Sequence, residues 1–159
     1  MSMFGPRVRR GMTVIDVIVT TGLVGIVTTF GAPELQDALR RRTVQASADQ
    51  FTTAHSLARA TAIRYGRVAQ LHVDAAARRF WIEVDTSADD VGQRATIWYD
   101  RTLDDPGVQI SSDRSLLCFD ARGLAYDVDP CQPGDAQLVF SVLDAADTVH
   151  TTVLGKVLR

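Results

Sequence analysis

The sequence lacks the residue patterns on which most enzymes depend. Its three histidines, His55, His72 and His150, share no metal-ligand spacing with one another or with the two cysteines. It contains no glycine-rich phosphate loop, no Walker lysine, and no Ser-x-x-Lys or His-Glu-x-x-His motif. The sequence therefore predicts a protein that is not an enzyme and needs no cofactor or metal. The histidines are predicted to be ordinary surface or half-buried residues.

The chain also lacks a strong excess of either charge, with 17 basic and 19 acidic side chains in 159 residues. Three of the basic residues, Arg7, Arg9 and Arg10, lie at the very start, so the chain from Met12 onward has 14 basic and 19 acidic residues. This acidic balance argues against broad nucleic-acid binding, although a local basic patch can survive it. The length suits one globular domain plus an anchor.

Residues 12–32 contain no Lys, Arg, Glu, His or Pro, and Asp16 is their single acid. A helix of these 21 residues is roughly 31 Å long, close to the hydrocarbon thickness of a bilayer. The arginines before it are expected to stay on the cytoplasmic side. The segment is therefore predicted to insert in a membrane.

A carboxylate in such a helix normally has a partner. Cleavage between Gly11 and Met12 would create an α-amino group one helical turn from Asp16, on the same subunit or beside a neighbour. A cleaved secretory signal fits less well, because the apolar run exceeds the usual length and no A-x-A site follows it. A plain anchor does not explain Gly11, Asp16 and Pro33 together.

These residues resemble the N-terminal motif of type IV pilins and type II secretion pseudopilins: a basic leader ending in Gly11, then Met12-Thr13-Val14-Ile15, an acid, an apolar run and Pro33. The family usually has Glu where this chain has Asp16. The resemblance implies that prepilin peptidase cuts after Gly11 and methylates the amine of Met12. It also implies that Asp16 pairs with that amine during assembly.

After Pro33, which should loosen the helix, apolar residues recur at helical spacing and predict one helix over about 12–65. The expected apolar stripe comprises Val44, Phe51, Ala54, Leu57, Ala58 and Ala62. Alternation beyond Gly66 predicts a hairpin of residues 68–73 and 80–84. Further strands are predicted at 95–99, 108–111, 116–119, 137–143 and 148–154, with turns at 104–107, 120–123 and 144–147. The fold class is therefore α+β, a long helix packed on antiparallel strands.

The Ala- and Arg-rich segment 58–64 followed by a Val-rich hairpin resembles the GspH/FimT subgroup of minor pilins and pseudopilins. Two further motifs, Phe119-Asp120-Ala121-Arg122-Gly123 and Gly155-Lys156-Val157-Leu158-Arg159, are similar to that subgroup's phenylalanine-to-glycine turn and closing glycine-basic strand. The resemblance implies a minor component of a filament rather than its major subunit.

Cys118 and Cys131 enclose a short loop, whose closure is worth about 3 kcal/mol in the chain-entropy model. With the leader inside the cell they lie in the periplasm or its equivalent, where disulfides persist, so a bridge is favoured over two free thiols. Acidic loops at 85–90 and 127–135 suggest calcium, but neither has EF-hand spacing, and solvated turn acids are the better interpretation.

Two basic groups remain. Arg40, Arg41 and Arg42 follow the apolar run by about two turns, where anionic headgroups, acidic neighbours in a filament or plain solvent are alternatives. In FimT-like proteins a terminal glycine-basic motif binds DNA, and Lys156 and Arg159 form a weakened version of it. Two cations supply only a small counterion-release contribution, so such binding would be weak and salt-sensitive.

The expected organisation is a prepilin leader at 1–11, a transmembrane and assembly half-helix at 12–33, a periplasmic half-helix at 34–66 and a β-rich globular domain at 67–159. The leading hypothesis is a minor pseudopilin or pilin, single-pass in the inner membrane, that joins other pilins in a periplasmic pseudopilus or type IV pilus. Its expected partners are prepilin peptidase, those pilins and secreted cargo. The alternative is a FimT-like DNA-binding minor pilin of natural transformation.

Overall fold

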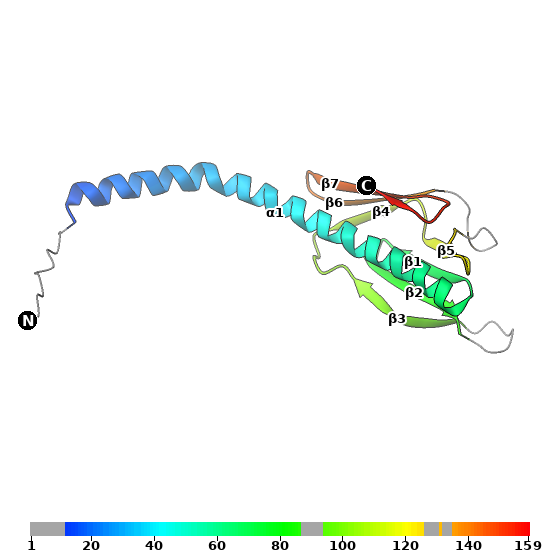
Figure 1. Ribbon diagram of the computed structural model, residues 1–159. Helices are drawn as coiled ribbons and strands as arrows, with labels where there is room; N and C mark the ends of the chain where they lie inside the picture. Colours follow the sequence, from blue (N-terminus) through cyan, green and yellow to red (C-terminus); the bar gives the residue numbers. More distant parts are fainter. Residues whose placement is uncertain (1–11, 87–93, 126–130, 132–134) are drawn as a thin grey trace, which may run out of the picture. The chain divides into compact units, whose positions relative to one another are not determined.

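The computed structural model describes residues 12–86, 94–125, 131 and 135–159 of the chain. These residues form one long helix followed by eight strands (Figure 1). In chain order the elements are α1 (Val14–Tyr65), β1 (Ala69–Asp74), β2 (Arg79–Asp85), β3 (Arg94–Thr102), β4 (Gln109–Ser112), β5 (Leu116–Phe119), β6 (Ala136–Val142), β7 (Ala145–Thr151) and β8 (Val157–Leu158).

The chain divides into two compact units, Met1–Ala38 and Leu39–Arg159, with the boundary inside α1. Helix α1 continues through Pro33 and ends in a glycine cap. There Gly66 adopts a positive φ of 62°, the Gly66 amide donates to the Ile63 carbonyl and the Arg67 amide donates to the Ala62 carbonyl. This pair of bonds is a Schellman motif, which explains why the helix stops where the sequence changes period.

The strands of the second unit form two four-stranded antiparallel sheets. The first has the order β3-β2-β1-β5 and the second β4-β6-β7-β8. The predicted hairpin is confirmed, with Leu71 opposite Ile82 and Val73 opposite Phe80. Long-range pairing places β5 on the other edge of β1, so that Gln70 faces Cys118.

The second half of α1 supplies one wall of the core, and both sheets supply the rest. Phe51 is fully buried, with its ring 5.6 Å from that of Phe80 in the first sheet and 6.1 Å from that of Phe140 in the second. Most other helix positions in the core are small: Ala48, Ala54, Ala58 and Ala62 are all fully buried. Small side chains let the helix backbone approach the sheets closely, and Phe51 fills the space where the two sheets meet.

The predicted α+β class is confirmed, whereas some details of the prediction are wrong. Residues 144–147 were expected to form a turn, but β7 already begins at Ala145 and ends at Thr151, and the turn is only Leu143 and Asp144. Leu143 adopts a positive φ of 51°, which such a tight connection requires. Leu57 is 39% exposed rather than part of the buried stripe. Conversely, His55 is buried, with only 2% of its surface exposed.

Candidate functional site

The first turn of α1 contains the acid on which the sequence interpretation depends. One carboxylate oxygen of Asp16 accepts hydrogen bonds from the Thr13 amide (3.0 Å) and the Thr13 hydroxyl (2.8 Å), and the Asp16 amide donates to that hydroxyl (3.3 Å). Thr13 and Asp16 thus form a capping box that fixes the helix start. Met12 lies next to this box and is 82% exposed, while Gly11 lies outside the described residues.

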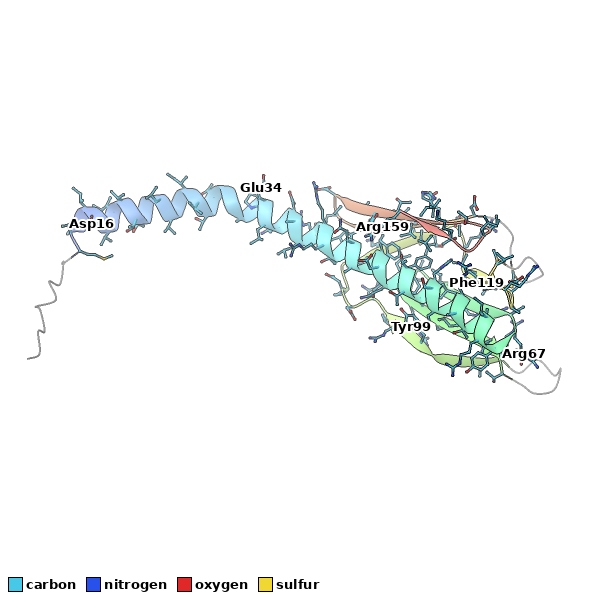
Figure 2. All side chains as sticks on the ribbon, viewed as in Figure 1. Asp16, Glu34, Arg67, Tyr99, Phe119 and Arg159 are labelled. Atoms are coloured by element: carbon cyan, nitrogen blue, oxygen red, sulfur yellow. A yellow bond between two sulfur atoms is a disulfide. The ribbon has the colours of Figure 1, made fainter. Side chains whose placement is uncertain are left out.

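The part of α1 that follows exposes its apolar side chains on every face (Figure 2). Val14, Ile18 and Val27 are 78%, 65% and 67% exposed. The hydroxyls of Thr21 and Thr29 donate to the carbonyls one turn back, at 2.7 and 2.8 Å, so they need no other partner. By length and composition this helix can cross a membrane, with a mean hydropathy of 1.9 over its most apolar 18 residues. Within the described part of the first unit, no other side chain buries them.

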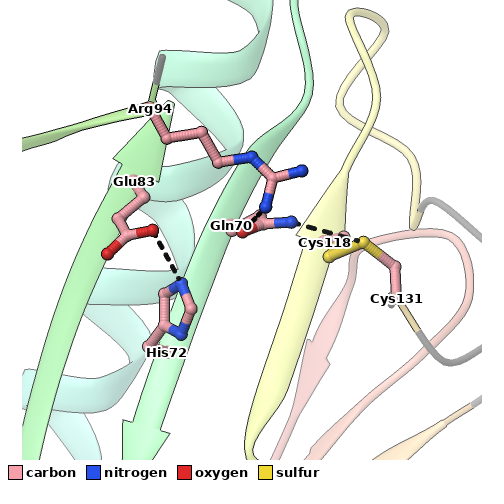
Figure 3. The surroundings of a disulfide bond; sticks show 6 residues. All are labelled: Gln70, His72, Glu83, Arg94, Cys118 and Cys131. Carbon is pink, nitrogen blue, oxygen red and sulfur yellow. Dashed lines mark hydrogen bonds and ion pairs between the residues drawn. A yellow bond between two sulfur atoms is a disulfide. The ribbon is translucent and has the colours of Figure 1, made fainter. Parts of the chain in front are cut away.

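The predicted pair Cys118 and Cys131 forms a disulfide, with the two Cα atoms 5.8 Å apart. Figure 3 shows that Gln70, which the sequence analysis did not single out, lies beside this bridge. The Gln70 amide nitrogen contacts the Cys131 sulfur at 3.9 Å, and its amide oxygen accepts from the Arg94 guanidinium at 2.8 Å. Gln70 is 1% exposed, so these contacts satisfy a polar side chain that burial would otherwise destabilise.

Next to this bridge, the same face of the first sheet carries a second set of polar and aromatic contacts. The His72 ring stacks on Trp81 at 4.7 Å with an interplanar angle of 4°. Glu83 accepts from the Trp81 indole at 2.9 Å, and its other oxygen lies 3.3 Å from His72 Nε2 (Figure 3). Partial burial lowers the pKa of His72, against the opposing pull of Glu83. These contacts hold Trp81 in a fixed position on the sheet.

His55 lies on the buried face of α1, with its ring 4.8 Å from Phe119 in an edge-to-face contact. Burial, assisted by the neighbouring Arg59 charge, lowers the pKa of His55 to about 4. The ring is therefore neutral at pH 7 and acts as a core aromatic. Apolar periodicity could not identify it, because a histidine is not counted among apolar residues.

The two glycine motifs of the sequence meet on Arg59. Its guanidinium donates to the Gly155 carbonyl at 3.1 Å, and Gly123 packs on its side chain. Both glycines have positive φ, 76° at Gly123 and 68° at Gly155. A Cβ at Gly155 would lie 2.8 Å from the Gly123 carbonyl oxygen, so the close approach of the two turns requires glycine there.

Lys156 and Arg159 were predicted as DNA contacts and lie on either side of β8. The Arg159 guanidinium donates to Asp147 at 2.7 Å, to Asp49 at 2.6 Å and to the Gln45 carbonyl at 3.2 Å. It thereby joins β7 to α1 within the second unit. Lys156 is exposed, and within the described part of the chain its ammonium group makes no ion pair. The structure thus brings Arg159 to acidic partners and leaves Lys156 open to solvent.

Among the described residues, no group of three or more His, Cys, Asp or Glu side chains is placed to hold a metal ion. The acidic loops considered for calcium fall largely outside the described residues, at 87–93, 126–130 and 132–134.

Residues 47–154 match the protein family described as Type II transport protein GspH. The fold is similar to that of the type IV minor pilin FimU of Pseudomonas aeruginosa, with a TM-score of 0.57 and 13% identity over 74% of this chain and 88% of FimU. It is also similar to the minor pseudopilin EpsH of the Type 2 Secretion System of Vibrio cholerae, with a TM-score of 0.55 and 17% identity over 72% of this chain and 94% of EpsH. No curated protein matches the sequence.

Proposed function

The chain belongs to the GspH family of type II transport proteins and is a minor pseudopilin or pilin, and we propose that it assembles through α1 into a periplasmic pseudopilus or type IV pilus. It is a structural subunit rather than an enzyme, and minor pseudopilins assemble with other pilins or pseudopilins. In this proposal the chain is first held in the inner membrane by α1, with the β-rich unit in the periplasm, where it contacts partner pilins or secreted cargo.

The observation that carries the proposal is the exposure of the first half of α1. Burial of a Val, Leu or Ile side chain is worth about 1.5–3 kcal/mol, and ten such side chains between Val14 and Leu35 are exposed, too many to remain in water. Lipid covers them before assembly, and the helices of neighbouring subunits cover them afterwards. Gly22 and Gly25 support the second state, because nothing lies within 4 Å of either Cβ position and another helix can approach there.

Processing at Gly11 would prepare the helix for this exchange. In the proposal, prepilin peptidase cuts between Gly11 and Met12 and methylates the new amine. That amine lies at most one helical turn from Asp16, whose carboxylate has one oxygen bonded to Thr13 and therefore keeps capacity for a positive partner. The partner amine belongs to the same subunit or to its neighbour. Pro33, which lacks an amide hydrogen, would let the helix loosen on leaving the membrane.

Mass spectrometry of the membrane-extracted protein tests processing. We expect a chain that begins with N-methylated Met12, and a Gly11→Leu variant that keeps its leader. A wild-type protein with the leader still attached would overturn the proposal.

Three substitutions at Asp16 separate its hydrogen bonds with Thr13 from its proposed pairing with the amine. Asp16→Asn keeps an acceptor for Thr13 but removes the charge, Asp16→Glu keeps the charge, and Asp16→Ala removes both. We expect normal membrane insertion for all three, with filament incorporation reduced for Asn and Ala and largely retained for Glu. Glu34→Gln, which removes an exposed carboxylate further along the helix, is the matched control. Wild-type incorporation of Asp16→Asn would refute the pairing.

The alternative, a DNA-binding minor pilin, receives less support from the geometry. A phosphate that approached Arg159 would have to displace Asp49 and Asp147, so of the two residues predicted to contact DNA only Lys156 offers a readily available cation. Duplex DNA binding by the full chain and by a Lys156→Ala/Arg159→Ala variant over a salt series tests this alternative. Binding that weakens in the variant would restore it, whereas equal binding or none would remove it.

A further inference from the structure

Two arginines at the start of the second unit have no role in the contacts described above. Arg41 and Arg42 are exposed, and within the described part of the chain neither forms an ion pair. Their neighbour Arg40 is half-buried and already engaged within the chain. Arg41 borders a hollow of about 360 Å³ that also contains Asp144 and Asp147, and Asp147 is bonded to Arg159. Arg41 and Arg42 are therefore available to a partner outside the chain.

Their charge contrasts with the rest of the unit. Beyond Arg42 the sequence has 11 basic and 16 acidic residues, so the body that follows is acidic and would be repelled by a negative surface. The positive charge is concentrated where the chain leaves its apolar helix. A negatively charged partner would thus be attracted at this end of the unit and repelled elsewhere.

The helical geometry indicates a partner that surrounds the helix. Consecutive residues on an α-helix point about 100° apart, so Arg41 and Arg42 face different directions, and a layer of lipid headgroups around the helix would meet both. They follow Pro33 in the sequence by eight and nine residues, which rise about 12–14 Å in a helix at 1.5 Å per residue. Helical side chains lean toward the helix N-terminus, which here is the direction of the apolar segment. Long arginine side chains that lean this way reach back toward the outer part of the headgroup layer.

We propose that Arg41 and Arg42 bind the phosphate groups of anionic phospholipids on the side of the membrane where the β-rich unit lies. Guanidinium groups bind phosphate oxygens with two parallel hydrogen bonds. A phosphate group is therefore a better partner for these arginines than an uncharged surface. The contact would hold the acidic unit at the membrane until the helix is extracted for assembly. The proposal rests on the membrane anchoring proposed above.

The test measures which lipids the full-length chain retains. The protein, purified in a non-ionic detergent, is mixed with equal amounts of phosphatidylglycerol and phosphatidylcholine of identical acyl chains, repurified, and its bound lipids are quantified by mass spectrometry. We expect wild type to retain phosphatidylglycerol preferentially and the Arg41→Gln/Arg42→Gln variant to lose about tenfold of that preference. The preference should also vanish at about 0.5 M salt, where charges are screened over a few ångströms. Arg101→Gln/Arg122→Gln removes two other exposed arginines and should behave as wild type.

Equal lipid ratios in wild type and the Arg41/Arg42 variant would overturn the inference, as would an equal loss in both double variants. A variant that loses a partner pilin but keeps its lipid ratio would overturn it in favour of an acidic protein contact. The two proposals fail separately: a chain that keeps its leader but prefers phosphatidylglycerol refutes only the filament role. A processed, assembled chain without lipid preference refutes only the lipid contact.

Discussion

The two halves of α1 differ in what can stabilise them. From Val14 to Ala38 the described side chains are exposed, and most of them are apolar. From Leu39 to Tyr65 the helix buries a stripe against two sheets of its own chain, with Val44, Phe51 and Ala58 at 1% exposure or less. The same backbone conformation thus serves an element that needs another molecule and an element that does not.

This difference determines which property of the protein a substitution in α1 should change. A residue in the second half affects the free energy of unfolding of the β-rich unit, because its partners lie in the same chain. A residue in the first half affects membrane anchoring or assembly, because its partners lie elsewhere. The four predictions that follow test this division, beginning with the largest expected effect.

Phe51→Ala should destabilise the β-rich unit by about 3–5 kcal/mol, because it removes the ring between Phe80 and Phe140 and leaves a cavity. Urea unfolding of the full chain in mild detergent, followed by tryptophan fluorescence, measures the change. Leu57→Ala, on the exposed side of the same helix, is the control and should cost less than about 1 kcal/mol. Equal effects of the two substitutions would mean that the buried stripe is misassigned.

Acidification should destabilise the same unit through His55. Its pKa is about 4 in the folded chain and near 6.5 when unfolded, so the unfolded state binds the proton more tightly. The stabilisation from neutral His55 is complete above about pH 6.5 and is lost as the pH falls toward 4. At pH 5 the loss amounts to about 2 kcal/mol. We expect His55→Phe to have a smaller loss of unfolding free energy between pH 7 and pH 5 than wild type. His150→Gln, on the exposed side of β7, should keep the wild-type slope. An unchanged slope in His55→Phe would place the histidine in contact with solvent.

Arg159→Ala should cost about 1 kcal/mol, since its ion pairs with Asp49 and Asp147 are partly exposed and solvent screens them. The loss should shrink at high salt. Arg122→Ala breaks an ion pair confined to one exposed turn and should change stability by less than about 0.5 kcal/mol. If the two variants were equally stable, the bridge from β7 to α1 would contribute nothing.

Leu23→Ala should leave the unfolding free energy of the β-rich unit within about 0.5 kcal/mol of wild type, because this exposed side chain belongs to the first unit and is no part of the core of the second. Its effect should instead appear as reduced incorporation into filaments, measured by co-purification with partner pilins. A clear loss of unit stability in this variant would break the comparison between the two halves of α1.

Local patterns in the sequence determined most of the elements. The uninterrupted apolar run predicted the exposed half of α1, alanine-rich periodicity predicted the buried half, and alternation predicted the hairpin of β1 and β2. The two cysteines are only 13 residues apart, so their pairing was also within reach. Each of these features depends on residues that are neighbours in the chain, which is why periodicity and spacing could find them.

Contacts between distant segments decided the rest. The division of the strands into two sheets, the burial of His55 and the meeting of Gly123 with Gly155 on Arg59 all depend on which segments lie together after folding. Arg159 shows the reason most directly, because its partner Asp49 lies 110 residues away and no local pattern links the two. From the sequence, Arg159 was predicted to be available to a ligand. In the tertiary structure its guanidinium lies between two carboxylates and links β7 to α1.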